Sequence, residues 1–324
     1  MKVHTENKKY IKQINTVVTV GTFDGLHRGH LKILETMKSI AGKINGTSVM
    51  VTFDPHPRKI ISKDYNLKML TTTEEKIALL NNAGIDNLLV VKFTEEFSQL
   101  TSDEFIKQII VDTIGAAHMV VGHDHKFGRD RLGDENKLRE FGRLYNFDVT
   151  SVPAERINDE IISSTKIRNS LFEGDIEKAN LFLGRNYSMS GTVVKGSQRG
   201  RTLGFPTANI QPDSPDKAIA KRGVYAVSCK CEDEQQFGIM NIGLRPTFGG
   251  TPVLVIEVHL LNFNKDIYGK KLTVDFMKRL RDEKKFETKE ELIHQIEIDK
   301  QKAVQMFETE MQNINSADGS DLRN

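Results

Sequence analysis

The first half of the chain alternates short apolar runs with segments whose apolar residues recur at helical spacing. The apolar runs are typical of buried strands, and they cover Thr16–Val20, Ser48–Phe53, Asn87–Val91 and His118–Val121. Between the first two runs, the apolar residues from Leu31 to Ile44 follow a helical period. This alternation predicts an α/β fold, a doubly wound parallel sheet with helices on both faces. Such sheets bind ligands beyond the carboxyl ends of their strands.

Two helix starts are marked by capping boxes, in which Ser or Thr is followed three residues later by Glu or Gln. Thr72 with Glu75 fits this pattern, and so does Thr101 with Glu104. We therefore expect one helix to begin at each pair, on either side of the Asn87–Val91 strand.

From about Tyr187 the pattern changes to short strands separated by turns that contain Gly or Pro. We expect strands at Met189–Val194, Gly223–Cys231, Phe237–Ile242, Val253–Leu261 and Lys271–Phe276. They predict a small antiparallel β-barrel, closed by one helix from Thr288 to Met311. The polar tail from Asn313 to Asn324 is expected to be disordered. The domain boundary is placed after Gly184, which gives domains of residues 1–184 and 185–324.

Composition limits the classes of protein that fit. A chain of 324 residues favours two domains, and its 38% apolar and 28% charged residues are typical of soluble globular proteins. A net charge of +2 argues against a dedicated nucleic-acid binder. No apolar run is long enough to span a bilayer, and Met1–Tyr10 lacks the apolar stretch of a signal peptide. Cys229 and Cys231 are therefore expected to be reduced thiols in a cytoplasmic protein.

The segment Gly21–His30 follows the first predicted strand directly and leads into the first predicted helix. Its glycines allow the backbone to approach a ligand closely. The helix N-terminus offers free N–H groups and the positive end of a dipole, which suit phosphate. His27 and His30 are spaced to face the same bound group, and they can donate hydrogen bonds to phosphate oxygens as negative charge develops.

Two alternatives remain open for this histidine pair. The two residues can be ordinary surface histidines at a helix start. They can also belong to a zinc site, because further histidines follow neighbouring strands: His56, His123 and His125. A catalytic zinc ion normally takes three protein ligands, and this half of the chain has no cysteine, so we expect no zinc.

The segment Gly21–His30, GTFDGLHRGH, resembles the GxFDGxHxGH signature of the HxGH nucleotidylyltransferases, in the form found in bacterial FAD synthetases. Three further segments are similar to the same enzymes: Thr52–Pro57, Val121–Gly128 and Ile162–Arg168. The resemblance implies in-line attack of an FMN phosphate on the α-phosphorus of ATP, with release of pyrophosphate.

The same resemblance implies roles for single residues. His27, His30 and Arg168 would be catalytic, the histidines against the triphosphate and Arg168 against the leaving pyrophosphate, for which its planar fork is suited. The residues implied to bind ATP are Gly21, Phe23, Gly25, Asp124, Ser164 and Thr165. Those implied to bind flavin are Phe53, Asp54, Pro57 and Phe127. Core packing is the alternative for Phe53 and Phe127. Thr22 and His125 depart from the family pattern.

The second domain has no Walker sequence, so a P-loop kinase is not expected. It has instead the glycine-rich, basic segment Gly191–Asn209, whose backbone donors and charges suit polyphosphate. Pro206 keeps the residue before it extended. Thr207 and Asn209 therefore project to the same side, where their oxygens can reach one Mg²⁺ ion. A solvated basic loop is the alternative.

Within this segment, the string from Gly200 to Asn209 resembles the GxxLGFPTAN hallmark of riboflavin kinases. Lys221–Ala226, Asn241–Phe248 and Ile256–Leu260 are similar to the same family. The resemblance implies that Glu257 is the general base for the riboflavin 5′-hydroxyl, with Val258 where many relatives carry Thr. It implies Mg²⁺ ligation by Thr207 and Asn209, and flavin binding by Arg281. Lys195, Gly196, Arg201, Thr207 and Asn209 would bind ATP.

Together the two resemblances imply the bacterial bifunctional arrangement, with riboflavin, FMN, FAD and ATP as ligands, Mg²⁺ as cofactor, and no nucleic-acid or membrane partner. Two rival functions are a monofunctional nucleotidylyltransferase whose barrel serves binding or assembly, and a flavin-sensing regulator that binds nucleic acid. The intact FPTAN string and Glu257 argue against the first. The near-neutral charge argues against the second, whose best feature is the basic run from Lys195 to Arg201.

Overall fold

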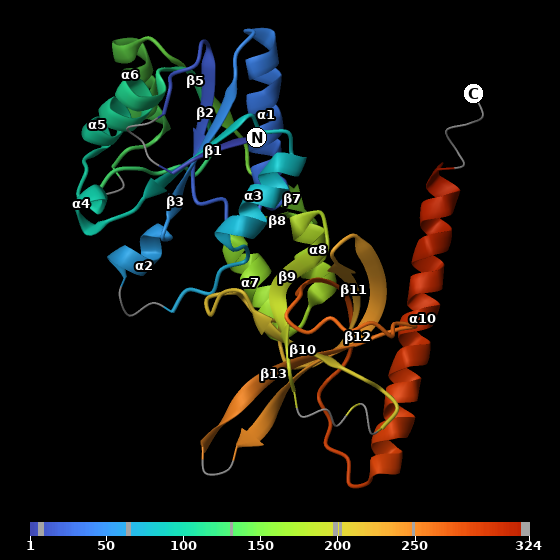
Figure 1. The fold of residues 1–324 in the computed structure, drawn as a ribbon. Coiled ribbons are helices and arrows are strands. Elements are labelled where there is room, and N and C mark those ends of the chain that lie inside the picture. Colours follow the sequence, from blue (N-terminus) through green and yellow to red (C-terminus); the bar gives the residue numbers. More distant parts are fainter. Residues whose placement is uncertain are drawn as a thin grey trace. The chain divides into compact units, whose positions relative to one another are not determined.

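The computed structural model describes residues 1–5, 10–62, 66–129, 132–196, 200, 203–247 and 250–318. It separates into two compact units, residues 1–166 and 167–324 (Figure 1). The division falls inside α7 (Ser164–Glu173), which is followed by α8 (Ile176–Leu183). The domain boundary expected after Gly184 lies after α8 and stays a prediction.

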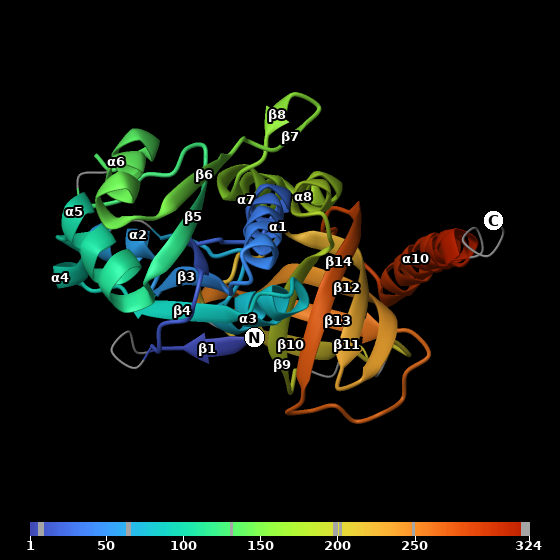
Figure 2. The ribbon, with the colours of Figure 1, turned by 90° about the horizontal axis from the view of Figure 1, so that it is seen from above.

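The core of the first unit is a sheet of six strands, in the order β1-β4-β3-β2-β5-β6, with every neighbouring pair parallel (Figure 2). The strands are β1 (Lys2–His4), β2 (Thr16–Val20), β3 (Ser48–Asp54), β4 (Asn87–Lys92), β5 (Ala116–Gly122) and β6 (Asp148–Val152). The four predicted strands are confirmed. The strands β1 and β6 were not predicted, because their short, largely polar sequences contain no apolar run. The strand order reverses at β2, and such switch points are where doubly wound sheets bind ligands.

Helices cover both faces of this sheet (Figure 2), as predicted. The elements outside the sheet are α1 (Arg28–Lys43), α2 (Pro57–Ile61), α3 (Thr73–Asn82), α4 (Glu95–Ser98), α5 (Ser102–Phe105), the π-helix η2 (Ile106–Ile114), α6 (Glu135–Tyr145), and the short strands β7 (Arg156–Ile157) and β8 (Glu160–Ile161). Val17 and Met50 pack with α1 and α3 on one face, while Val18 and Val49 pack with η2 and α6 on the other.

Both capping boxes form, so those two predictions are confirmed. At the start of α3, the Thr72 N–H donates to Glu75 Oε2 at 2.9 Å and the Glu75 N–H donates to Thr72 Oγ1 at 3.2 Å. The second box, Thr101 with Glu104, starts α5 in the same way. Each box satisfies backbone donors that a helix start leaves without an internal partner.

The second unit contains a closed antiparallel barrel in the order β10-β13-β12-β11-β14-β9. Its strands are β9 (Tyr187–Val194), β10 (Ala208–Pro212), β11 (Gly223–Cys231), β12 (Glu234–Thr247), β13 (Gly250–Leu260) and β14 (Lys271–Arg281). The barrel and five of its strands are as predicted. The strand β10 was not predicted, because its sequence, ANIQP, has too few apolar residues to show a period of two.

The strands of the barrel alternate between its interior and its outer face. On β13, Ile256 and Val258 are 3% and 0% exposed, while Glu257 between them faces the other side. Cys229 and Cys231 are free thiols, both buried, as expected for reduced cysteines. Burial raises the pKa of both thiols, which keeps them protonated.

A long helix, α10 (Lys289–Asp318), packs against the barrel (Figure 1). The rings of Phe237 and Phe307 stack with centroids 4.2 Å apart. The expectation of a disordered tail from Asn313 is wrong as far as Asp318. The helix continues because no Gly or Pro occurs before Gly319, and polar residues alone do not end a helix. In the described part of the chain, no helix is long and apolar enough to cross a membrane.

A bidentate ion pair also holds α10 to the barrel. Arg281 Nε donates to the two Asp299 oxygens at 3.1 and 2.9 Å, and Arg281 Nη2 lies 2.8 Å from Oδ2. Asp299 is 2% exposed, and Gln295 Nε2 donates to its Oδ1 at 3.0 Å. A buried carboxylate with these partners is stabilised only as long as the guanidinium stays in place.

We predict that Asp299→Ala lowers the free energy of unfolding of the second unit by about 2 to 4 kcal/mol, because it leaves a partly buried guanidinium without its counter-charge. Glu234→Ala is the control, since Glu234 pairs with Lys265 where both side chains are at least half exposed. It should cost less than about 1 kcal/mol. Calorimetry of the full chain measures both variants. Equal stability losses in the two variants would contradict the proposed contribution of the Arg281–Asp299 ion pair to stability.

Candidate active sites

The segment Gly21–His30 forms a strained turn at the carboxyl end of β2. Phe23 and Leu26 have φ values of 47° and 41°, a region that side chains resist, and Gly25 has a φ of 84°. A Cβ on Gly21 would lie 2.8 Å from the Phe23 ring, so only glycine allows this ring to fold back over the turn. The turn therefore needs external restraint to keep its shape.

Asp24 supplies part of that restraint. Its side chain is 1% exposed, and it accepts hydrogen bonds from the backbone N–H groups of Leu70 and Thr71 at 2.9 and 3.0 Å. The Gly25 N–H in turn donates to Thr71 Oγ1 at 3.1 Å. The Asp of the motif thus joins the turn to the segment that precedes α3.

His27 and His30 lie together at the start of α1, as their spacing predicts. His27 is the N-cap residue, and its Nδ1 accepts from the His30 N–H at 3.4 Å. The two rings stack with centroids 3.6 Å apart, and Phe23 lies 4.8 Å from the His30 ring. His27 is only 6% exposed, so it is not an ordinary surface histidine. The first turn of α1 has no acidic residue, which suits an anion there.

The predicted pyrophosphate-binding residues lie on or near the start of α7. Ser164 Oγ donates to the Asp24 carbonyl at 2.9 Å, so the structure brings Ser164 to the turn. Thr165 is exposed next to it. Arg168 is one helical turn further on, past the division between the two units, and it is 8% exposed. Its role stays a prediction.

The predicted flavin-binding residues Phe53 and Phe127 belong to a row of aromatic rings. Phe53 lies 5.5 Å from Phe93 and 5.9 Å from Phe97, while Phe127 lies 6.1 Å from Phe105. Phe127 is 7% exposed inside an apolar cluster, which agrees with the core-packing alternative. Phe53 is only partly buried, at the carboxyl end of β3.

Other candidates lie at the ends of neighbouring strands. Asp54 and Pro57 follow at the end of β3, and Asp54 is exposed. Asp124 follows β5 and is also exposed, 3.8 Å from His123 Nδ1. The ring of His125, the second departure from the family pattern, stacks on Phe127 at 5.6 Å. Contacts of these residues with a ligand remain predictions.

Sequence reasoning missed Lys76 in this unit. It lies on α3, is 5% exposed, and its Nζ donates to the Thr22 carbonyl at 2.6 Å and to Thr52 Oγ1 at 3.2 Å. The signal was present, because Lys76 and Leu80 are one turn apart and share the buried face of a helix whose start the capping box fixes.

In the second unit, the predicted site residues Glu257 and Asn209 form a row with Asn241 across three neighbouring strands. Glu257 on β13 pairs directly with Asn209 on β10 and with Asn241 on β12. Residues directly opposite each other in antiparallel strands project to the same face. The row therefore places one carboxylate between two carboxamides on the outer face of the barrel.

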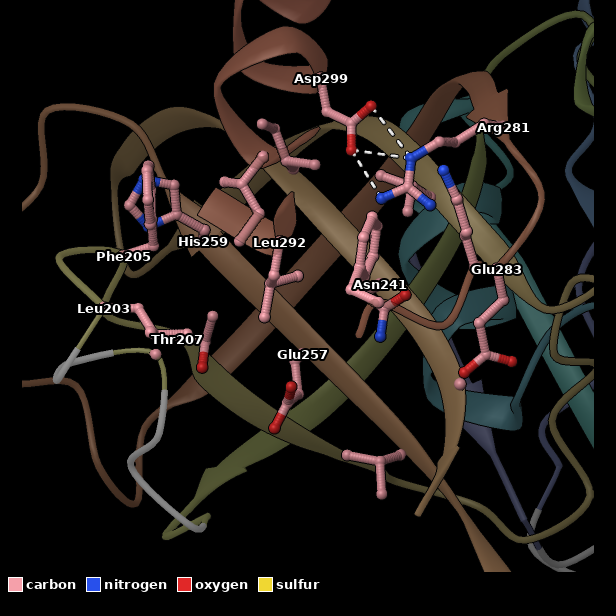
Figure 3. Close-up of a pocket in the computed structure, with 18 of the residues that line it drawn as sticks. Leu203, Phe205, Thr207, Asn241, Glu257, His259, Arg281, Glu283, Leu292 and Asp299 are labelled. Atoms are coloured by element: carbon pink, nitrogen blue, oxygen red, sulfur yellow. Dashed lines mark hydrogen bonds and ion pairs between the residues drawn. The ribbon is translucent and has the colours of Figure 1, made fainter. Parts of the chain in front are cut away.

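Glu257 and Asn241 line a pocket of about 420 Å³, together with Thr207 (Figure 3). This volume is in the usual range for small-molecule sites. The apolar lining comes from Leu203, Phe205, Val224, Ile239, Leu244, Val255, Phe286, Leu292 and Ile296. Arg281 also lines the pocket, although its guanidinium is held by Asp299. The pocket thus combines an apolar wall with a few convergent polar groups.

Two glycines allow the chain to run close to Thr207 and Asn209. A Cβ on Gly196 would lie 2.0 Å from Asn209 Nδ2, and one on Gly200 would lie 3.1 Å from Thr207 Oγ1 and 2.3 Å from the Phe205 carbonyl. Lys195 is exposed beside Gly196. Arg199 and Arg201 lie outside the described residues, so their expected part in phosphate binding stays a prediction.

Sequence reasoning also missed Arg245. Its Nη2 lies 2.8 Å from Glu257 Oε1, and the two side chains are 39% and 26% exposed. Arg245 belongs to the Asn241–Phe248 segment singled out above, which was the available signal. As for metals, the described residues contain no group of three or more His, Cys, Asp or Glu placed to hold an ion.

Two family models match the chain, FAD synthetase over residues 9–166 and riboflavin kinase over residues 183–307. A protein of Buchnera aphidicola subsp. Schizaphis graminum, named bifunctional riboflavin kinase/FMN adenylyltransferase, is 40% identical over 88% of this chain and 92% of its own. A Listeria monocytogenes protein of the same name is 39% identical, over 89% and 91%. A solved structure described as a macrolide-efflux protein from Streptococcus pneumoniae superposes with a TM-score of 0.84 at 28% identity, covering 92% of this chain and 97% of its own.

Proposed function

This chain belongs to the bifunctional riboflavin kinase/FMN adenylyltransferase family, and from that premise we propose how its residues divide the two reactions. It is an enzyme of flavin cofactor biosynthesis, which phosphorylates riboflavin to FMN with ATP and transfers the adenylyl group of ATP to FMN to form FAD. The observation that carries this conclusion is the presence of both family matches on one chain. The match of the second unit to riboflavin kinase argues against a monofunctional transferase.

For adenylylation, the turn at the end of β2 receives the triphosphate of ATP. Support comes from the N-terminus of α1, whose N–H groups favour an anion, and from the adjacent rings of His27 and His30. An FMN phosphate oxygen attacks the α-phosphorus, the bond to the β-phosphate oxygen breaks, and pyrophosphate leaves. The two histidines donate hydrogen bonds to the charge that builds up in this step. Ser164, Thr165 and Arg168 hold the pyrophosphate.

For the flavin of this reaction, the end of β3 is the proposed wall. Phe53 is partly exposed there, and Asp54 and Pro57 follow directly. Phe127 supports Phe53 indirectly, through the rings of Phe97 and Phe105. Flat apolar surface of this kind suits the isoalloxazine ring.

For phosphorylation, Glu257 is the proposed general base. Arg245 engages Oε1 of the carboxylate, and within the described part of the chain Oε2 has no hydrogen bond. The geometry supports a role for Oε2 in accepting the proton of the riboflavin 5′-hydroxyl. The hydroxyl oxygen then attacks the γ-phosphorus of ATP, and ADP leaves. Leu203, Phe205 and Leu292 provide apolar surface for the flavin ring.

These ATP-dependent reactions imply a divalent metal ion, and we propose Mg²⁺. The fit rests on the donor set, since Mg²⁺ prefers hard oxygen ligands and Thr207 and Asn209 provide a hydroxyl and a carboxamide oxygen. Glycine at positions 196 and 200 keeps methyl groups away from both oxygens. When bound, the ion would neutralise charge on the ATP phosphates. The expected absence of zinc stays a prediction, as do a cytoplasmic location and the lack of nucleic-acid or membrane partners.

The proposed domains are residues 1–184 for adenylylation and 185–324 for phosphorylation. All residues proposed for the kinase, from Lys195 to Arg281, lie in the second range. The helix α8 precedes it, but Asn180 on α8 donates to the Phe276 carbonyl at 2.8 Å and accepts from the Tyr187 N–H at 2.7 Å. We infer that α8 adds stability to the barrel without adding a catalytic group.

We predict that His30→Ala lowers the rate of FAD formation from FMN by about a hundredfold or more, because it removes a donor aimed at developing phosphate charge. Riboflavin phosphorylation by the same protein should be unchanged. His118→Ala is the control, since that imidazole bonds Thr150 Oγ1 at 2.8 Å within the sheet. Normal FAD formation by His30→Ala would show that the site is assigned wrongly.

We predict that Glu257→Gln lowers FMN production by about two orders of magnitude or more, since the amide keeps the shape and loses the base. Riboflavin binding and FAD formation from supplied FMN should persist. Glu283→Gln removes another carboxylate of the same pocket and is the matched control. Comparable losses in both variants, or near-normal turnover in Glu257→Gln, would exclude the general-base role.

We predict that residues 185–324 and residues 167–324, each made as a fragment, convert riboflavin to FMN and form no FAD. The longer fragment should have the higher Tm, because it keeps the hydrogen bonds of Asn180 to the barrel. Chromatography of the products with ATP and Mg²⁺ measures the first expectation, and thermal melting the second. If both fragments were folded and neither made FMN, the domain proposal would have to be withdrawn.

A further inference from the structure

Lys76 is a buried cation that the mechanism above does not use. Its side chain is 5% exposed, whereas lysine is among the residues least often buried. Moving an ammonium group out of water costs several kcal/mol unless charges and hydrogen bonds compensate. A methionine at this position would fill a similar volume at no such cost. The retained charge therefore needs a reason beyond packing.

The contacts of Lys76 join two different parts of the first unit. Its Nζ donates to the carbonyl of Thr22, inside the Gly21–His30 turn, at 2.6 Å. It also donates to Thr52 Oγ1 on β3 at 3.2 Å, and Thr52 Oγ1 itself lies 3.4 Å from the Thr22 carbonyl. Thr52 stands directly before Phe53 and Asp54. One ammonium group thus connects the turn proposed for ATP with the strand end proposed for flavin.

The surrounding charges agree with this geometry. Burial lowers the pKa of Lys76, while the carboxylates of Asp24, in the turn, and Asp54, at the end of β3, raise it. The carboxylate of Asp24 is itself held by the backbone N–H groups of Leu70 and Thr71. The strained turn is therefore restrained twice by residues 70–76, through the N–H groups that bind Asp24 and through the ammonium group of Lys76. The capping box at Thr72 fixes the start of α3 within this segment.

We propose that Lys76 is a positioning residue for FMN adenylylation, which holds the Gly21–His30 turn in register with the end of β3. This proposal rests on the proposed function of the first unit. The two substrates of adenylylation must meet with the FMN phosphate in line with the α-phosphorus. A displacement of about 1 Å between their sites can cost a hundredfold in rate. A rigid ammonium link between the two segments prevents that displacement.

The main test compares Lys76→Met with wild type in the full chain. We expect kcat for FAD formation to fall by about tenfold to a hundredfold, with smaller changes in KM for ATP and FMN. Riboflavin phosphorylation by the same protein should stay within about twofold of wild type and serves as internal control. Lys38→Met is the matched variant, since Lys38 also donates to a backbone carbonyl, that of Ala83, at 2.7 Å. It should leave both activities unchanged.

A pH profile adds a readout that a purely structural lysine would not move. Lys76 acts in its charged form, and burial lowers its pKa below the ordinary value for lysine. As the pH rises, kcat for FAD formation should therefore begin to fall at a lower pH than it would if the pKa of Lys76 were ordinary. The charged groups that face Lys76 are the carboxylates of Asp24 and Asp54. In Lys76→Met the residual activity should lack the alkaline limb.

Thr52→Val keeps the test decisive if Lys76→Met fails to fold, because at similar volume it removes the β3 partner of Lys76 together with the direct contact of Thr52 Oγ1 with the Thr22 carbonyl. FAD formation should then fall several-fold. Where both variants fold, the double variant should lose less than the product of the two single losses, since both break one link. A normal kcat in Lys76→Met or in Thr52→Val, or strictly multiplicative losses, would overturn the positioning role. A full rate in His30→Ala would instead displace the proposed site itself.

Discussion

The first unit depends on the burial of one carboxylate. Asp24 is almost fully enclosed, and an enclosed charge is tolerated only when donors surround it. Those donors include the backbone N–H groups of residues 70 and 71, which every substitution other than proline keeps. These hydrogen bonds of Asp24 hold a turn in which Phe23 and Leu26 adopt unfavourable φ values. The stacked histidines and the start of α1 owe their placement to that turn.

In the second unit the main constraint is that a small closed barrel fills its own interior with side chains. Polar groups for chemistry must then lie on the outer face, where α10 and the segment around Phe205 cover them. The alternation along β13 produces this result, with Ile256 and Val258 inward and Glu257 outward. An almost wholly apolar strand thus carries a partly buried carboxylate, whose charge is compensated by the guanidinium of Arg245.

Much of this arrangement could be predicted from the sequence, because it is set by local patterns. The apolar runs predicted β2 to β5, the capping boxes predicted the starts of α3 and α5, and the glycine-rich strings indicated the two candidate sites. What could not be predicted depends on partners distant in the chain. The strands β1, β6 and β10 form because neighbouring strands pair with them. The helix α10 continues to Asp318 because no Gly or Pro ends it earlier. Spacing could mark Lys76 as a buried helix residue, and Arg245 lies in a segment already singled out, but their contacts with Thr22 and Glu257 could not be read from the sequence.

The two sheets differ in how they end. The barrel closes through the pairing of β10 with β9, but among the described residues the outer part of the β12–β13 hairpin has no further strand beside it, because β10 pairs with β13 only at Ala208 and Asn209. The parallel sheet ends at β1 and β6, and β1 is only three residues long. Short edges that carry polar side chains are poor templates for the addition of a strand from another molecule. The short polar edges of the parallel sheet therefore protect the first unit against edge-to-edge aggregation.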